Sequence, residues 1–220
     1  MSHLSNWLLR FGFRLLYDEL AWTYDLVARA TSIGQWRSWQ RAALPELIGG
    51  RMLEIAHGTG DMLLDLLALG LDPIGIDLSP SMGRLARRKL KRHGLDCPLV
   101  RASVLALPFA AASFPTLLST FPTEFLFDPI VVKEFYRVLQ PGGRLVAVPN
   151  AVITGRAPSD RLGRWLYRVT HQAGTELPDR VLKPYRTAGF RASIKTIPLP
   201  RSIVHLILAD KPMGDVTRGA

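Results

Sequence analysis

The feature that most constrains this chain is residues 51–61, Arg-Met-Leu-Glu-Ile-Ala-His-Gly-Thr-Gly-Asp, where a short apolar run ends in two closely spaced glycines. The run is typical of a buried strand, and the segment from Asp61 to Leu69 has the pattern of a helix. Gly58 and Gly60 predict a tight turn that brings backbone N–H groups and a helix N-terminus to a ligand. A second short strand ends in Asp77, whose carboxylate can accept hydrogen bonds from ribose hydroxyls. Together these features indicate a nucleoside-containing cofactor.

Strand and helix patterns alternate through the middle of the chain, which predicts an α/β fold with a parallel sheet. We expect strands over 52–56, 73–77, 98–101, 116–120 and 144–148, and helices over 35–44, 61–69, 80–93, 129–139, 159–171 and 179–188. Two closing strands, 191–197 and 203–208, are separated only by Pro198-Leu199-Pro200 and must be antiparallel. The sequence therefore predicts a mostly parallel, seven-stranded sheet with an antiparallel C-terminal strand and helices on both faces.

The chain length of 220 residues suits a single domain. We expect four parts within it: an N-terminal helical cap (1–45, with a helix over 4–29), a cofactor-binding core (46–150), a substrate-covering segment (151–177), and a closing helix and hairpin (178–210).

Charge and cysteine content limit the partners and the compartment. Lysine and arginine number 28 against 18 acids, a net charge of +10, which favours nucleic acid, an acidic lipid surface or a phosphorylated substrate, or is simply a solvated basic surface. The single cysteine, Cys97, excludes an internal disulfide and a thiolate metal cluster, and we expect no metal site.

The uncharged run 102–123 is long enough to cross a membrane but contains three prolines, so we do not expect it to be a membrane-spanning helix. We expect a cytoplasmic protein that can contact the inner face of the membrane peripherally.

Two classes of cofactor suit a glycine turn followed by an acid. Dinucleotide oxidoreductases carry a third glycine where this chain has Leu63. Glu54, within the first strand, would repel a pyrophosphate but would suit a ligand that carries an ammonium group. The antiparallel hairpin at the C-terminus also departs from the fold of dinucleotide-binding proteins. The residues therefore favour a nucleoside cofactor that carries an ammonium group over a dinucleotide.

Several segments, in the right order, carry a resemblance to a known family. They are 53–61, 77–82, 106–109 and 138–143, together with the stretches 17–25 and 34–37. The first four resemble the motifs of class I S-adenosylmethionine-dependent methyltransferases, which have a Rossmann-like fold. The last two are similar to the N-terminal cap of the ubiquinone/menaquinone-biosynthesis C-methyltransferases.

The resemblance implies roles for individual residues. Gly58 and Gly60 would let the backbone run close to the methionine end of S-adenosylmethionine. Asp77 would bind both ribose hydroxyls, and Leu78 and Met82 would hold the adenine between them. Ser103 stands where the family often has an acid that binds the adenine amine, so this contact would be weaker. The expected cofactor-binding set is Tyr24, Glu54, Ala56, His57, Gly58, Thr59, Gly60, Asp77, Leu78, Met82, Ser103, Val104, Thr120 and Phe121.

Methyl transfer is an in-line displacement, for which a protein mainly aligns the reactants and excludes water. A base is needed only if the nucleophile must lose a proton. The candidates are Glu124, His57 and His171. A solvated helix cap or loop residue is the more frequent explanation for Glu124, and a structural turn is an equal alternative for His57. The helix over 159–171, with arginines opposite Trp165 and Leu166, suits an anionic or membrane-dissolved acceptor, core packing being the alternative.

The favoured function is methyl transfer to a small-molecule or lipid-like acceptor, such as a quinone-type ring or a phospholipid head group. Charge motivates an alternative, an RNA or protein methyltransferase. Against it, Phe121-Pro122-Thr123-Glu124 stands where amino methyltransferases carry Asn/Asp-Pro-Pro-aromatic, so nucleic acid is the weaker choice of partner. A non-catalytic, cofactor-binding scaffold protein is the third possibility.

Overall fold

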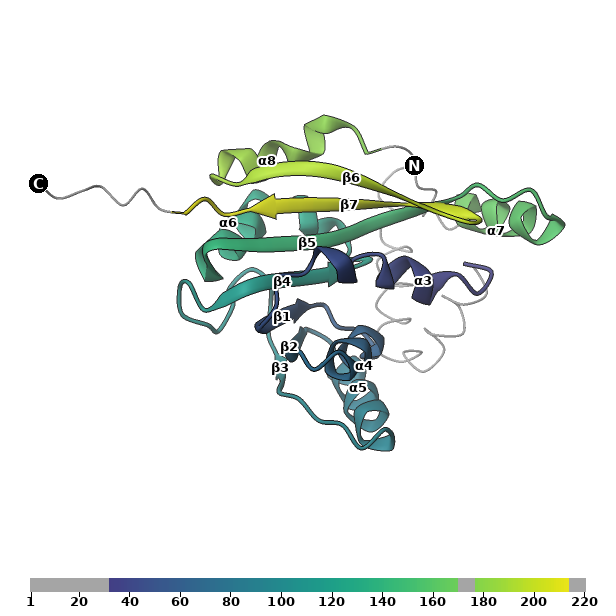
Figure 1. Ribbon diagram of the computed structural model, residues 1–220. Coiled ribbons are helices and arrows are strands. Elements are labelled where there is room, and N and C mark those ends of the chain that lie inside the picture. Colours follow the sequence, from purple (N-terminus) through teal and green to yellow (C-terminus); the bar gives the residue numbers. More distant parts are fainter. Residues whose placement is uncertain (1–31, 170–176, 214–220) are drawn as a thin grey trace, which may run out of the picture.

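The structure, a computed structural model, describes residues 32–169 and 177–213. These residues form a seven-stranded sheet in the order β3-β2-β1-β4-β5-β7-β6 (Figure 1). The predicted helix over 4–29 lies outside the described residues, and so do Tyr24 and His171. In the described part of the chain, no helix has both the length and the apolar character needed to cross a bilayer.

The parallel half of the sheet confirms the predicted α/β architecture. Its strands are β1 (Arg51–Ile55), β2 (Asp72–Asp77), β3 (Leu99–Arg101), β4 (Phe114–Thr120) and β5 (Leu139–Ile153). β1 lies at the centre, where Leu53 pairs with Ile74 of β2 and with Leu117 of β4. Every residue of β1 after Arg51 is buried, as expected for a strand that helices cover on both faces.

Alternate residues of β1 pack against two different layers of helices. Leu53 and Ile55 belong to the apolar cluster of α6 (Pro129–Val138) and α8 (Lys183–Thr187). Met52 belongs to the cluster of α3 (Trp36–Arg41) and α4 (Asp61–Ala68). Figure 1 shows α4 on the other side of the sheet from α6 and α8, next to α5 (Pro80–Arg92). Because side chains alternate along a strand, Glu54 lies on the same side as Met52.

Two helices, α5 and α6, begin at residues that cap them. Ser79 Oγ accepts a hydrogen bond from Met82 N–H at 3.3 Å at the start of α5. Asp128 Oδ1 accepts one from Ile130 N–H at 2.8 Å at the start of α6. Proline follows each cap, at a position where the missing N–H costs nothing. These local signals explain why both helices begin where the sequence predicts.

The C-terminal hairpin is antiparallel as predicted, but its turn lies elsewhere. β6 (Arg191–Leu199) and β7 (Ser202–Asp210) pair up to Leu199 opposite Ser202, which leaves Pro200 and Arg201 as the turn. The predicted turn over 198–200 was wrong because Pro198 pairs with Ile203 inside the ladder. β6 is an edge strand, where the missing N–H of a proline can face away from the ladder.

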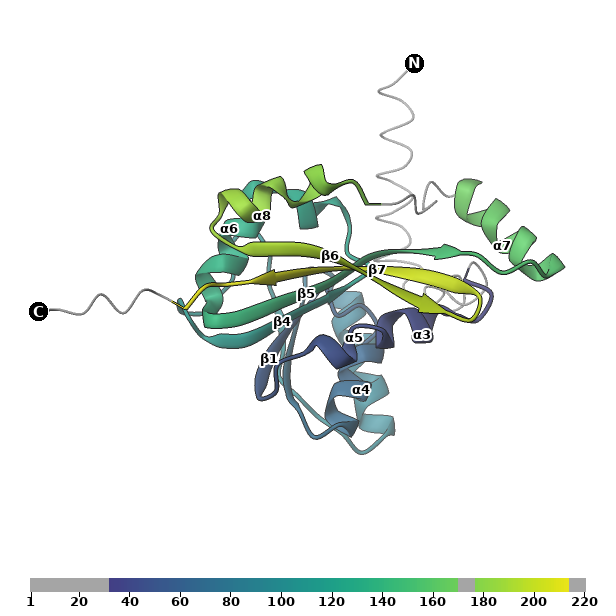
Figure 2. The same cartoon turned by 45° about the horizontal axis from the view of Figure 1, so that its top comes forward.

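β5 was predicted to end at Val148 but continues to Ile153. β7 pairs with β5 on both sides of Pro149. The register of this pairing shifts between Ala147 and Asn150, so the ladder continues although Pro149 has no N–H group to donate. The extension leads to α7 (Pro158–Val169), which lies beyond the main body of the sheet (Figure 2). The remaining elements are short 3-10 helices: Leu44–Glu46, Glu124–Phe127 and Asp179–Leu182.

Candidate functional site

A cavity of about 560 Å³ opens at the carboxyl ends of β1, β2 and β4. In an open α/β sheet, ligands bind at this edge, where successive connections run in opposite directions. The loops after these strands and the helix α3 line the cavity. The predicted cofactor residues that line it are Ala56, His57, Gly58, Thr59, Asp77, Leu78, Ser103, Val104, Thr120 and Phe121.

The two glycines of the turn after β1 have different functions. Gly58 has a φ of +54°, and a Cβ added there would meet no atom of the described residues within 4 Å, so its backbone borders open space in the cavity. Gly60, at φ +83°, does not line the cavity; an added Cβ would lie 2.9 Å from Ala86 Cβ of α5. Gly58 therefore leaves open space at the cavity, whereas Gly60 allows α4 to approach α5 closely.

Two non-glycine residues with left-handed backbone border the same cavity. Ala56 follows β1 with a φ of +56°, and Phe121 follows β4 with a φ of +51°. This conformation costs about 1–2 kcal/mol for a residue with a Cβ. Such strain persists only where the surrounding structure imposes it, and it concentrates at ligand sites.

Asp77, at the end of β2, is held in place by the backbone. Its Oδ2 accepts a hydrogen bond from Gly58 N–H at 2.9 Å, and its Oδ1 accepts one from Ser79 N–H at 2.8 Å. A carboxylate has about four lone-pair positions, so both oxygens can accept further hydrogen bonds. The geometry fits a diol such as the two hydroxyls of a ribose.

His57 lines the cavity but is 5% exposed. Burial lowers the pKa of its imidazole, although the negative charge of Asp77 opposes the shift. The ring is therefore neutral at pH 7. Its Nδ1 lies 2.8 Å from the carbonyl oxygen of Gly58, which assigns the proton to Nδ1 because a carbonyl only accepts. A Cβ on Gly75 would lie 2.9 Å from His57 Cδ2, so this glycine makes room for the ring.

Glu54 is in β1 and is not among the residues that line the cavity. Its side chain is 2% exposed, and its Oε2 has no hydrogen-bond partner among residues 32–169 and 177–213. Burial, aided by the charge of Asp61, raises its carboxyl pKa well above the ordinary value, and Arg37 opposes the shift. A buried carboxyl oxygen without a partner beside the glycine turn is suited to a ligand that brings a cationic group.

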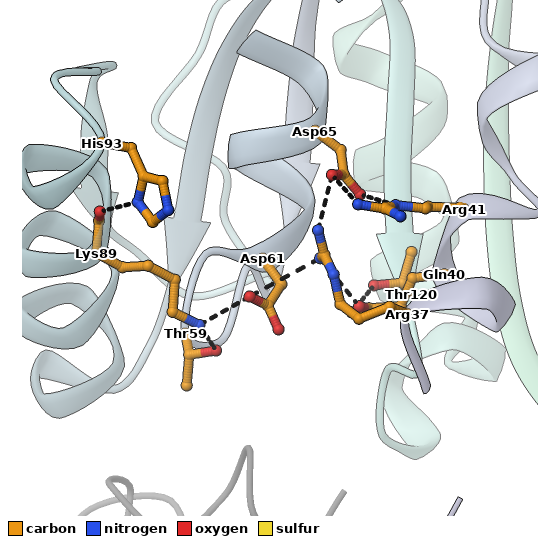
Figure 3. Close-up of polar contacts among 9 residues, drawn as sticks. All are labelled: Arg37, Gln40, Arg41, Thr59, Asp61, Asp65, Lys89, His93 and Thr120. Atoms are coloured by element: carbon orange, nitrogen blue, oxygen red, sulfur yellow. Dashed lines mark hydrogen bonds and ion pairs between the residues drawn. The ribbon is translucent and has the colours of Figure 1, made fainter. Parts of the chain in front are cut away.

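Ion pairs tie three helices together around the start of α4 (Figure 3). Lys89 Nζ of α5 lies 2.8 Å from Asp61 Oδ1 and donates to Thr59 Oγ1 at 2.9 Å. Arg37 Nη2 of α3 lies 2.7 Å from Asp65 Oδ1. Asp61 and Thr59 both line the cavity, so this network holds one wall of it.

Trp36 and Gln40 of α3 form the wall of the cavity next to β4. The ring of Trp36 stacks on Phe121, with centroids 4.1 Å apart and planes at 27°. Gln40 Nε2 donates a hydrogen bond to Thr120 Oγ1 at 3.2 Å (Figure 3). The sequence reasoning did not assign Trp36, Gln40 or Asp61 to the site. A helical pattern reveals an apolar face but not which strand end the helix covers.

Other predicted residues lie away from the cavity or outside the described chain. Met82 is fully buried and does not line the cavity. Glu124 is exposed in the 3-10 helix after β4, and its neighbours Thr123 and Phe125 line the cavity instead. Tyr24 and His171 fall outside the described residues. Within the described chain, His57 is thus the predicted proton acceptor that reaches the cavity.

Comparison with known proteins gives consistent results. Residues 52–143 match the family described as methyltransferase domain. The chain is 38% identical over 139 residues to a demethylmenaquinone methyltransferase of Thermus thermophilus, covering 60% of this chain and 63% of the relative. It is 30% identical over 207 residues to a demethylmenaquinone methyltransferase of Deinococcus radiodurans, covering 83% of this chain and 86% of the relative. The chain thus spans less than two thirds of the Thermus relative but most of the Deinococcus one.

A solved structure shows the same fold with a different activity. The [4+2]-cyclase SpnF has a TM-score of 0.60 at 17% identity, covering 82% of this chain and 81% of its own. At this identity the similarity concerns the fold alone. Because the similar protein is described as a cyclase, the reaction has to be argued from residues of the site.

Proposed function

This chain belongs to the S-adenosylmethionine-dependent methyltransferases that include the demethylmenaquinone methyltransferases, and on this premise we propose that it methylates a ring carbon of a quinone-type acceptor. The observation that carries the proposal is one continuous cavity with two chemically different walls. The Asp77 carboxylate lies at the end of β2, on one side of β1, and the Trp36–Phe121 stack lies beside β4, on the other. The first wall suits a nucleoside and the second a flat, apolar ring.

The residues at the β1–β2 end fit S-adenosylmethionine. Asp77 binds the ribose hydroxyls, and the open backbone at Gly58 admits the methionine end. The Glu54 carboxyl does not line the cavity, so it acts on the ammonium group only through its charge, from behind the glycine turn. Leu78, 65% exposed at the rim, and Val104 contact the adenine. When bound, this cofactor supplies a methyl group on a cationic sulfur, and the neutral thioether leaves as the nucleophile attacks in line.

The acceptor must present an electron-rich carbon to that methyl group. A quinone ring is electron-poor, whereas its reduced dihydroxy form is electron-rich next to each hydroxyl, above all once a hydroxyl loses its proton. We therefore propose the reduced form as the acceptor. The imidazole of His57 is the proposed proton acceptor because it lines the cavity and its Nδ1 faces the carbonyl of Gly58, which leaves Nε2 to accept. Burial lowers the pKa of this imidazole and so weakens it as a base, and the negative charge of Asp77 opposes that shift. Trp36, Phe121 and Phe125 exclude water from the reacting atoms.

The reaction is tested with S-adenosylmethionine labelled in the methyl group. The acceptors are a prenylated naphthalene-1,4-diol that lacks the ring methyl group, the corresponding oxidised quinone, and RNA and protein fractions of a cell extract. We expect label on a ring carbon of the diol and none on the quinone. Label in RNA or protein without transfer to the diol would overturn the proposed acceptor in favour of the macromolecular alternative. Binding of the cofactor without transfer to any pool would support a scaffold protein.

The cofactor assignment is tested by Asp77→Ala, with Asp72→Ala as the matched control. Asp72 lies at the other end of β2, is exposed, and pairs only with the exposed Arg51 in the described structure. Hydrogen bonds to a charged group contribute about 1.5–3 kcal/mol each, so losing them should weaken cofactor binding by more than tenfold. Calorimetry should show this loss for Asp77→Ala alone. Equal affinity in both variants would refute the ribose assignment.

We also propose that the protein meets a lipid-like acceptor at the anionic inner face of the cytoplasmic membrane. The exposed cations of α5 support this: Arg84, Arg87, Arg88, Lys91 and Arg92. Each basic residue near such a surface contributes about 1 kcal/mol. Flotation with phosphatidylglycerol vesicles should recover the protein at low salt and lose it at high salt, and charge reversal along α5 should abolish binding. Equal recovery with neutral phosphatidylcholine vesicles would refute the electrostatic argument.

A further inference from the structure

We propose that Gln40 and Thr120 select the acceptor by donating hydrogen bonds to one oxygen of its ring, while the ring packs on Trp36. This inference rests on the proposed methyl transfer and assigns the recognition of its acceptor. Both side chains line the cavity, and each is 8% exposed. They come from α3 and from the end of β4, so the acceptor wall is complete only when the two elements meet.

The orientation of the Gln40 amide follows from its neighbours (Figure 3). Arg37 Nη1 lies 3.5 Å from Gln40 Oε1, and a guanidinium can only donate, so the amide oxygen faces Arg37. Arg37 is itself held by Asp65 at 2.7 Å. The amide nitrogen therefore faces Thr120, to which one of its two N–H groups donates at 3.2 Å.

This arrangement presents two hydrogen-bond donors at one wall of the cavity. Because Thr120 Oγ1 accepts from Gln40, its own O–H group can donate, and the amide of Gln40 has a second N–H group. Both donors lie in a largely buried wall, where an unpaired donor is costly. The wall therefore favours a ligand atom that accepts hydrogen bonds, and most strongly an ionised oxygen, since charge-assisted hydrogen bonds are the stronger ones.

The aromatic stack beside these donors defines the shape of the ligand. Trp36 packs on Phe121, which directly follows Thr120 in the chain, and the left-handed backbone of Phe121 sets the direction of its ring. A flat ring packs on such a surface in an offset or edge-on arrangement. An oxygen on that ring lies next to the donors. The recognised class is thus a planar ring with a hydroxyl or ionised oxygen beside the methylated carbon, and an ammonium head group is disfavoured at this wall.

The test compares Gln40→Leu and Thr120→Val with Gln35→Leu, a control on the residue before α3 that does not line the cavity. The acceptors are the prenylated naphthalene-1,4-diol and the two naphthols that each lack one of its hydroxyls. With the diol, we expect kcat/KM to fall 10- to 100-fold in Gln40→Leu and Thr120→Val and to stay unchanged in the control. Cofactor affinity by calorimetry should be unaffected in Gln40→Leu and in the control. Thr120 also belongs to the expected cofactor-binding set, so Thr120→Val is compared on kcat/KM at saturating cofactor.

The specific signature is the dependence on the ring oxygen. One of the two naphthols lacks the oxygen that accepts hydrogen bonds from Gln40 and Thr120. With this naphthol the wild type should lose activity, and the difference in kcat/KM between the wild type and the variants should disappear because the two donors have no oxygen to bind. A merely structural role would lower activity equally with all three acceptors, or would weaken cofactor binding in parallel, and either result would overturn the inference. If the wild type transfers no methyl group to the diol, the proposed function itself fails. If it does and the variants match it, only the recognition role fails.

Discussion

Adding a methyl group at Gly60 is expected to destabilise the fold by about 3 kcal/mol while leaving the walls of the cavity in place. The backbone at φ +83° imposes about 1–2 kcal/mol of strain on any residue with a Cβ. The new Cβ would also lie 2.9 Å from Ala86 Cβ and 3.1 Å from Ala86 Cα, an overpacking that typically costs about 1–3 kcal/mol. The lower entropy of the unfolded chain offsets about 0.4–1 kcal/mol.

The matched variant is Gly58→Ala, two residues earlier in the same turn. Its φ of +54° imposes similar strain, but its Cβ would meet no atom within 4 Å, so the expected cost is about 1 kcal/mol. For a chain of this size, about 1 kcal/mol shifts Tm by roughly 2–4 °C. Calorimetric unfolding should therefore show a drop of roughly 6–12 °C for Gly60→Ala and a much smaller one for Gly58→Ala.

Cofactor affinity should follow the opposite order, because Gly58 borders the cavity and Gly60 does not. Gly58→Ala should weaken binding of S-adenosylmethionine at a temperature where both variants are folded, and Gly60→Ala should leave it close to the wild type. Equal losses of Tm in the two variants would refute the packing argument. A weaker affinity in Gly60→Ala than in Gly58→Ala would refute the separation of their functions.

Two further substitutions test the buried groups around this turn. Burial raises the Glu54 pKa above its ordinary value of 4.5, so folding favours the protonated form and its contribution to stability is lost as pH rises above about 4.5. Glu54→Gln should therefore raise Tm increasingly at higher pH while weakening cofactor binding; a Tm difference that is constant from pH 4 to pH 9 would contradict this. Ala56→Gly should relieve the strain at φ +56° and stabilise the protein by up to about 1 kcal/mol, and a lower Tm would argue against strain there.

The arrangement of the glycine turn and Asp77 at one edge of the sheet was predictable because its signals lie close together in the sequence. The strand before Gly58, the helix after it and the acid at the end of β2 are each encoded in a few consecutive residues, and the structure gives β1 and β2 within one residue of the predicted bounds. Parallel strands place their carboxyl ends at one edge, so Gly58 and Asp77 had to lie near each other.

The wall of the cavity formed by α3 and the end of β4 was not predictable in this way. Gln40 and Thr120 are 80 residues apart, and their hydrogen bond exists only because α3 packs over the end of β4. The function of Gly60 likewise depends on Ala86, a residue of another helix. Met82 illustrates the reverse case, since its place in a motif suggested a ligand contact but the α5 face on which it lies is buried.

Patterns between neighbouring residues were enough to predict the fold class, the glycine turn and the carboxylate at the end of the second strand, because periodicity and turn chemistry act locally along the chain. Tertiary packing set which side chains share the cavity, which glycine leaves open space there and which makes room for a helix, and why Glu54 Oε2 has no hydrogen-bond partner among the described residues. The physical reason is that burial and packing depend on segments distant in sequence, whose relative positions no local pattern encodes.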